Sequence, residues 1–244
     1  MYSGLPSRID LNPLAEEVDE VADRLEAEGP DATLAWTFER FGDTAAIATG
    51  FGPEGLVAID IAMSVADRPR VFFVDTGFLF PETYEVRTRL ERRYGIEIEA
   101  AEPLLSDDAI RSVHGPALWT TDPDRCCAVR KLEPLARYKE GLSAWVTGIR
   151  RDQTAARASA RVVEWDAKWG LVKVNPLAAW SREQVWDYVL DHGLPYNPLH
   201  DRGYPSLGCT HCTRPVAPGE HERSGRWAGF EKTECGLHGR FDKE

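Results

Sequence analysis

The residues of this 244-residue chain best suited to chemistry are its five cysteines. Four thiolates can hold a metal ion or an iron–sulfur cluster, which would leave one thiol chemically free. A structural zinc usually takes two C-x2-C loops, and two adjacent cysteines close awkwardly on one ion. Adjacent thiolates can reach two corners of a cubane, so the spacing favours a cluster. The five are an adjacent pair, a C-x2-C pair and a single residue: Cys126, Cys127, Cys209, Cys212 and Cys235.

Two other uses of these cysteines are weaker. Disulfides need an oxidising compartment, and the first ten residues contain no apolar segment typical of a secretion signal. Buried structural cysteines are common as single residues, whereas this chain has pairs. No stretch of 18 apolar residues occurs, so the sequence predicts no membrane span and a cytoplasmic protein.

Cys235 is the candidate for the reactive thiol. His238 follows three residues later, and a protonated histidine near a thiol lowers the pKa of that thiol and makes it a nucleophile. A thiol on a C-terminal tail could face first a substrate and then a second protein. The alternative is an inert C-terminal thiol.

The charge distribution indicates a local anionic ligand. The net charge of −11 argues against nucleic-acid binding, which needs a basic surface. Basic residues nevertheless recur beside the cysteines and glycines. Solvated helix faces are an equal alternative for Arg157 and Arg161. The other basic residues near these motifs are Arg125, Arg130, Lys131, Arg150, Arg151, Arg214, Arg223 and Arg226.

The elements that must position these groups alternate between strand and helix. Strands are predicted at 45–49, 70–74, 96–98, 143–147 and 171–174. Helices are predicted after Asn12-Pro13, around 34–38, over 56–65 and 81–94, and after the capping box Ser181–Gln184. This alternation predicts an α/β fold with a parallel sheet flanked by helices.

Three regions are expected along the chain. Residues 1–42 form an N-terminal helical segment, and 43–194 form a nucleotide-binding α/β core. Residues 195–244 form a loop-rich C-terminal extension that carries cluster ligands and the reactive cysteine and folds over the site. Ligands of such sheets bind at the carboxyl ends of the strands, where segments 49–55, 75–80 and 147–153 fall.

Two of these segments and one basic pair carry specific hypotheses. The loop Thr49–Gly55 lies between a strand and a helix, and its backbone N–H groups could hold a phosphate, although a plain tight turn is an alternative. Arg130 and Lys131 follow the adjacent cysteines by about one helical turn, so they could compensate cluster charge and reach an anionic substrate. A surface pair between Lys131 and Glu133 is the alternative.

Taken together, these residues resemble the assimilatory adenylyl-sulfate reductases, the cluster-containing branch of the family that includes the phosphoadenylyl-sulfate reductases. The resemblance runs from about Ala45 to His238. The segments that carry it are Phe73–Tyr84, Cys126–Leu135, Thr147–Gln153, Cys209–Cys212 and Glu234–His238.

The resemblance implies a fold of the adenine nucleotide alpha hydrolase type, with Thr49, Gly50 and Gly52 in a modified pyrophosphatase loop. It implies that a dithiol donor, thioredoxin or a glutaredoxin-like protein, reduces adenosine 5′-phosphosulfate to sulfite and AMP, with Cys235 forming an S-sulfocysteine. Other implied substrate contacts are Lys131, Arg150, Arg223, Arg226 and the catalytic His238. The implied ligands of a [4Fe–4S] cluster are Cys126, Cys127, Cys209 and Cys212.

Three rival hypotheses stay open on the sequence alone. The same chemistry could act on the 3′-phosphorylated substrate, although reductases of that type usually lack the four cluster cysteines. A zinc-bearing nucleotide-binding or tRNA-modifying protein of the same superfamily would be colourless and would not need Cys235. A redox-sensing cluster protein would bind no adenylyl sulfate. The oligomeric state is also open, a homo-oligomer included.

Overall fold

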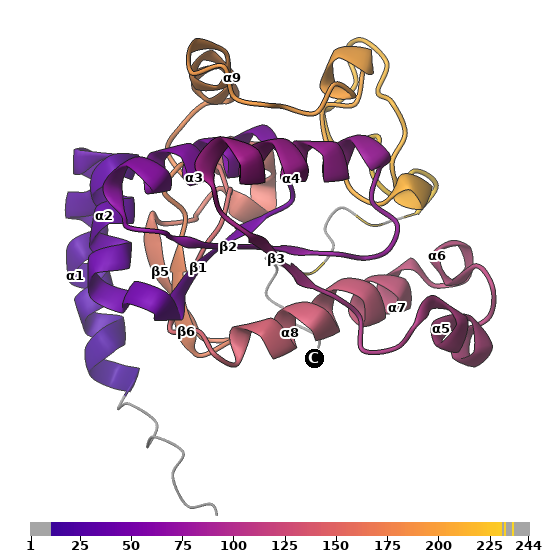
Figure 1. The fold of residues 1–244 in the computed structure, drawn as a ribbon, viewed down its shortest axis with the longest axis horizontal. Helices are drawn as coiled ribbons and strands as arrows, with labels where there is room; N and C mark the ends of the chain where they lie inside the picture. Colours follow the sequence, from indigo (N-terminus) through magenta and orange to yellow (C-terminus); the bar gives the residue numbers. More distant parts are fainter. Residues whose placement is uncertain (1–10, 231, 233–235, 237–244) are drawn as a thin grey trace, which may run out of the picture.

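A mixed six-stranded sheet organises the computed structural model, which describes residues 11–230, 232 and 236 (Figure 1). The strand order is β3-β2-β1-β4-β6-β5. All neighbouring pairs are parallel except β5 with β6, so the predicted parallel α/β fold is confirmed for five strands. The strands are β1 Ala45–Thr49, β2 Arg70–Val74, β3 Ile98–Ala101, β4 Ala144–Val146, β5 Val163–Asp166 and β6 Leu171–Val174.

Two features of the sheet differ from the prediction. The antiparallel edge strand β5 was not expected, and it pairs with β6 from Val163↔Val174 to Asp166↔Leu171 across a short turn. Strand β3 was predicted at 96–98 but begins at Ile98, because only the residues from Ile98 onward lie opposite β2. Ile96 precedes the strand and packs, half-buried, against the core.

Helices cover both faces of the sheet. In Figure 1, α3 and α4 lie above the sheet, and α7 and α8 lie below it. The main apolar core is on the first side, where buried residues of α1, α3 and α9 meet the strands. The second side holds a smaller core around Phe72 and Leu135. The helices that contribute to the main core are α1 Leu11–Glu28, α2 Pro30–Phe41, α3 Pro53–Val65, α4 Pro81–Tyr94 and α9 Arg182–Asp191.

The helix starts follow local sequence signals. Three of these helices have proline in their first turn, where its missing N–H costs nothing. This is why α3 begins at Pro53 rather than at the predicted Leu56. The predicted capping box is confirmed, since Ser181 accepts from the Gln184 N–H and the Gln184 side chain accepts from the Ser181 N–H.

The second face is built around the adjacent cysteines. Three short helices, α5 Asp107–His114, α6 Leu118–Thr121 and α7 Pro123–Cys127, lead to a π-helical turn, Ala128–Leu132, and then to α8 Glu133–Lys139. A π-turn shifts the direction of the side chains that follow it, and such turns are frequent at functional sites. Short 3₁₀ turns occur at Gly42–Thr44, Arg151–Gln153, Ala155–Arg157, His200–Arg202 and Thr210–Cys212.

The C-terminal region returns to the carboxyl ends of the strands. In its described part it consists of loops, two 3₁₀ turns and isolated bridges, as predicted from Pro195 onward. The Thr210 N–H donates to the Phe78 carbonyl at 2.8 Å, and Leu79 bridges to Cys209. The division at 42/43 and 194/195 stays a prediction. None of the helices described is long and apolar enough to cross a bilayer.

Candidate active site

A cavity of about 270 Å³ opens at the carboxyl ends of the strands. Residues from all three expected loop segments line it, together with the C-terminal region and the turn after Cys127. Apolar side chains of Phe72, Leu135 and Trp145 form one part of its wall. The predicted substrate-binding residues that lie in the described part of the chain all line this cavity: Thr49, Gly50, Gly52, Lys131, Arg150, Arg223 and Arg226.

The shape of the Thr49–Gly55 loop is set by two close contacts. The Phe51 N–H donates to Thr49 Oγ1 at 2.9 Å, and Phe51 has a positive φ of 60°, which is uncommon for a bulky residue. A β-carbon at Gly55 would lie 2.4 Å from Thr49 Oγ1, so a larger residue cannot occupy this position without a shift. The loop therefore has a specific, constrained shape beside the N-terminus of α3.

Lys131 and Arg130 are both buried, but their side chains have different neighbours. Lys131 lines the cavity, and its charge partly opposes the rise that burial causes in the pKa of Cys212, which places its ammonium group near the cysteines as well. Arg130 donates to the Thr76 carbonyl at 3.1 Å, pairs with Asp107 and stacks on Phe78. Arg130 is not among the residues that line the cavity, so the expectation that it reaches an anionic substrate is not met, whereas its charge partly opposes the rise that burial causes in the pKa of Cys126.

The alternative expectation for Lys131, a surface ion pair with Glu133, is wrong. Glu133 bonds to Arg137 at 2.9 Å, one helical turn further on, while Lys131 is buried. Residues two apart on a helix point in different directions. The π-helical turn thus carries Lys131 inward and leaves the next acidic residue at the surface.

Arg226 is held against the backbone of the segment before Cys209. Its Nη1 donates to the Leu207 carbonyl at 2.7 Å, and its guanidinium lies 4.6 Å from the centre of the Trp227 ring. Its Nε is buried and has no hydrogen-bond partner among the described residues. An Arg with an unpaired buried donor at a cavity wall is suited to binding an anion.

Arg150 is the centre of an ion-pair network. Its side chain is only 3% exposed and contacts three carboxylates: Glu54, Asp152 at 2.9 Å and Glu222 at 4.0 Å. Gln153 joins the network by donating to Glu54 at 3.1 Å. Arg150 therefore lines the cavity, as expected, but its charge is shared with acidic side chains.

Arg157 also lines the cavity, where its guanidinium bonds to Gln153. The sequence left its role open between a ligand contact and a solvated face. Arg161 is different, because it pairs with Asp19 and Asp23 on the surface of α1. The Thr147–Gln153 motif ends four residues before Arg157, so nothing in the motif itself pointed to it.

The four predicted cluster cysteines form one group. Burial and the neighbouring thiols of Cys127, Cys209 and Cys212 raise the pKa of Cys126 to about 11. Burial, and next the thiol of Cys209, also raise the pKa of Cys212. Groups of three or more side chains placed to hold a single metal ion are absent from the described part of the chain. The four thiols therefore lie close enough to act on one another's pKa.

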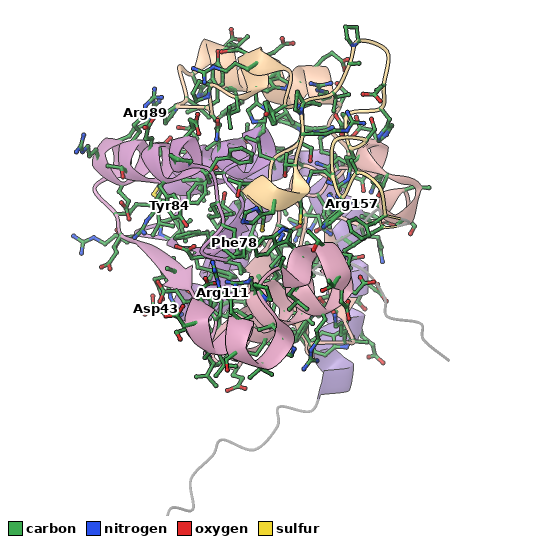
Figure 2. All side chains as sticks on the ribbon, turned by 90° about the vertical axis from the view of Figure 1, so that its right-hand side faces the viewer. Asp43, Phe78, Tyr84, Arg89, Arg111 and Arg157 are labelled. Atoms are coloured by element: carbon green, nitrogen blue, oxygen red, sulfur yellow. The ribbon has the colours of Figure 1, made fainter. Side chains whose placement is uncertain are left out.

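Side chains of two motifs surround this group. Thr76 Oγ1 lies 3.3 Å from Cys209 Sγ. Trp119 stacks on His211 with ring centres 4.0 Å apart, and Phe78 packs edge-on against both rings. In Figure 2, Phe78 lies between the C-terminal region and the helices that precede Cys126. No pattern in the sequence indicated these aromatic contacts, because Trp119 lies in a segment with no recognisable motif.

Cys235 and His238 lie outside the described residues. Two residues near Cys235 in sequence are described. Lys232 pairs with Asp124 of α7, and the Gly236 carbonyl accepts from Lys168 at 3.4 Å. The backbone N–H of Trp227 donates to the Cys212 carbonyl at 3.0 Å, so the segment that leads to Cys235 starts next to the cysteine group.

The chain is similar to several known proteins. The phosphoadenosine phosphosulfate reductase domain matches residues 44–215. A phosphoadenosine 5′-phosphosulfate reductase of Gloeobacter violaceus is 45% identical, over 91% of this chain and 93% of the relative. An adenosine 5′-phosphosulfate reductase of Salinibacter ruber is 44% identical, over 88% and 86%. Adenosine 5′-phosphosulfate reductase 2 of Bacillus subtilis is 43% identical, over 84% and 87%.

Solved structures show the same fold. The phosphoadenylyl-sulfate reductase of Candida auris, in a phosphate complex, superposes with a TM-score of 0.72 at 30% identity, covering 88% of this chain and 100% of that one. Yeast FAD synthetase superposes with a TM-score of 0.55 at 16% identity, covering 86% and 70%, which is a likeness of fold alone.

Proposed function

The chain belongs to the phosphoadenosine phosphosulfate reductase family, and we propose that it reduces adenosine 5′-phosphosulfate to sulfite and AMP in sulfate assimilation. The observation that carries the proposal is the position of Lys131. This buried cation lines the cavity and also acts electrostatically on Cys212. One charge therefore links a nucleotide-sized cavity to the cysteine group.

The cavity has the two kinds of wall that this substrate needs. Phe72, Leu135 and Trp145 offer an apolar surface for the adenine ring. Lys131, Arg223 and Arg226 offer positive charge for the phosphosulfate. A thiolate that approaches an anionic phosphosulfate is repelled by it, and fixed cations offset this repulsion where charge develops.

In the proposed reaction the Cys235 thiolate attacks the sulfur of the phosphosulfate. A Cys235 S–S bond forms, the bond between sulfur and the phosphate oxygen breaks, and AMP leaves with that electron pair. A thiolate of thioredoxin, or of a glutaredoxin-like donor, then attacks Cys235 Sγ, and sulfite leaves with the S–S electron pair. The second donor thiol resolves the mixed disulfide, so the dithiol supplies both electrons. His238 favours the thiolate form of Cys235.

Cys126, Cys127, Cys209 and Cys212 would hold a [4Fe–4S] cluster. The electrostatic influence of their thiols on one another supports this assignment. Thiolates at four corners of a cubane are farther apart than thiolates around one zinc. The bound cluster would supply a local charge that acts on Lys131 and on the electrostatic potential in the cavity. No step of the reaction passes through it.

Metal analysis and the visible spectrum of anaerobically purified protein test the cluster assignment. We expect a brown protein with about four irons per chain, the content of one cubane. Stoichiometric zinc in a colourless protein would instead support the rival hypothesis, a zinc-bearing nucleotide-binding or tRNA-modifying protein of the same superfamily. An iron protein that binds no adenylyl sulfate would support the redox-sensor hypothesis.

The substrate assignment is tested by kinetics. The kcat/KM for adenosine 5′-phosphosulfate should exceed that for its 3′-phosphorylated analogue, because the four-cysteine set accompanies the first substrate in this family. Equal or reversed values would favour the second candidate substrate, for which the Gloeobacter relative is named.

A further inference from the structure

The loop between Arg214 and Gly225 forms the outer edge of the cavity. It is closed at its base by the Thr213↔Arg226 bridge and by the Arg214 N–H, which donates to the Gly225 carbonyl at 2.9 Å. A β-carbon at Gly225 would lie 2.3 Å from the Arg214 carbonyl oxygen, so the base is tight. Most residues from 217 to 221 are exposed, yet the loop carries Arg223, which lines the cavity.

Two glutamates of this loop have different partners. Glu220 pairs with Arg214 at 3.3 Å and accepts from the Ala217 N–H at 2.8 Å, so its contacts stay inside the loop. Glu222 instead reaches the α/β core. Its carboxylate lies 3.7 Å from Arg182 Nε and 4.0 Å from Arg150 Nη2, and it is 21% exposed.

The two arginines that Glu222 reaches belong to the α/β core. Arg150 is buried and already held by Glu54 and Asp152. Arg182 begins helix α9, and its backbone N–H donates to Asp152 at 3.3 Å. A carboxylate that reaches these arginines therefore restrains the loop relative to the strands and the Thr49–Gly55 loop.

We propose that Glu222 is a positioning residue that latches this loop to Arg150 and Arg182 and so holds Arg223 at the cavity. The proposal rests on the proposed function, because it assigns Arg223 to the phosphosulfate. Glu222 and Arg223 are adjacent in the chain, so fixing the Glu222 carboxylate also restricts the backbone that carries the Arg223 side chain. The separations of 3.7 and 4.0 Å make each ion pair modest, so the restraint depends on both arginines together.

The matched variants are Glu222→Gln and Glu220→Gln. Both remove one carboxylate charge from the same loop, but only Glu222 is tethered to the core, and only Glu222 lines the cavity. For Glu222→Gln we expect the KM for adenosine 5′-phosphosulfate to rise about threefold to thirtyfold with kcat changed less than about threefold, as for the loss of partly buried charge pairs. Glu220→Gln should stay within about twofold of wild type, and Glu222→Asp should lie between.

A second readout does not depend on catalysis. Trypsin cleaves after arginine, and because an acidic residue just before the arginine slows it even in an unfolded chain, each rate is divided by that of the same variant unfolded in denaturant. By this ratio, measured from fragment masses, the bond after Arg223 should be cut several times faster in Glu222→Gln than in wild type or Glu220→Gln. Faster cleavage together with the higher KM supports the latch. Faster cleavage with an unchanged KM, or equal behaviour of the two Gln variants, overturns it. A wild-type protein that does not reduce adenosine 5′-phosphosulfate would refute the proposed function, while the cleavage comparison would still decide whether Glu222 restrains the loop.

Discussion

The guanidinium of Arg226 lies directly on the α-carbon of Gly208. A β-carbon at Gly208 would be 2.2 Å from Arg226 Nη2 and 2.6 Å from Cζ. Gly208 immediately precedes Cys209, and Cys209 belongs to the cysteine group. One backbone position therefore sets the place of a cavity cation and of a proposed cluster ligand.

Gly208→Ala should weaken substrate binding. Because the added methyl group needs the space of the guanidinium, Arg226 must move, and we expect kcat/KM to fall about tenfold, as for a lost charge-assisted contact. Steady-state kinetics with iron analysis measures this. Gly141→Ala is the control, since a β-carbon there meets nothing within 4 Å. Equal kinetics for the two variants would show that Arg226 needs no such space.

Removal of each cavity cation should lower kcat/KM. Lys131→Ala, Arg223→Ala and Arg226→Ala should each lose roughly tenfold to a thousandfold, because each removes a charge that offsets repulsion in the transition state. Arg214→Ala is the matched control, since Arg214 pairs with Glu220 outside the cavity wall. Near wild-type kinetics for all three variants would contradict their placement at the phosphosulfate.

Cysteine replacements should separate into two classes. Serine at Cys126, Cys127, Cys209 or Cys212 should remove iron and activity together, because a cubane needs four thiolates. Cys235→Ser should keep the colour and bind substrate but release no sulfite. Wild-type protein mixed with substrate and no donor should gain one sulfite-sized mass on the Cys235 peptide, which thioredoxin then removes. An adduct on another cysteine would contradict the mechanism.

The pair of Lys232 and Asp124 should position the segment that carries Cys235. The Lys232 side chain is 8% exposed and pairs with Asp124, which is 81% exposed and lies two residues before Cys126. Lys232→Asp should lower kcat without loss of iron, because the link between the tail and α7 is broken. Lys232→Asp combined with Asp124→Lys should restore part of the rate by reversing the pair. No recovery in the double variant would indicate that the pair itself does not set the rate.

Lys139 should make stability depend on pH. It is 3% exposed, its Nζ lies 3.0 Å from the Trp145 ring centre, and burial lowers its pKa to about 6, with Asp166 opposing and Lys173 and Lys168 adding to the effect. The unfolded chain has a lysine pKa of about 10.4. Between these values the unfolded state binds more protons, so the free energy of unfolding should rise with pH.

Lys139→Met should therefore stabilise the protein at pH 7, by an amount that shrinks as the pH approaches about 10. Thermal unfolding across this range measures the effect. A destabilised Lys139→Met at pH 7 would mean that a charged ammonium is held by the indole rings.

Local patterns predicted much of the fold and of the site. Strands β1, β2 and β6, helix α4 and the Ser181 capping box depend on neighbouring residues, so the sequence alone located them. The cysteine spacing indicated a group of four. The rule that ligands bind at the carboxyl ends of strands correctly brought Thr49 and Arg150 to one cavity, while the resemblance indicated Arg223 and Arg226.

What only the tertiary structure decided depends on contacts between distant segments. The direction of Arg130 toward Asp107 and the reach of Glu222 to Arg150 join residues far apart in the chain. Arg130 and Lys131 are neighbours with similar charge, and no local pattern separates them. Their roles differ because a π-helical turn directs one to a carboxylate and the other into the cavity.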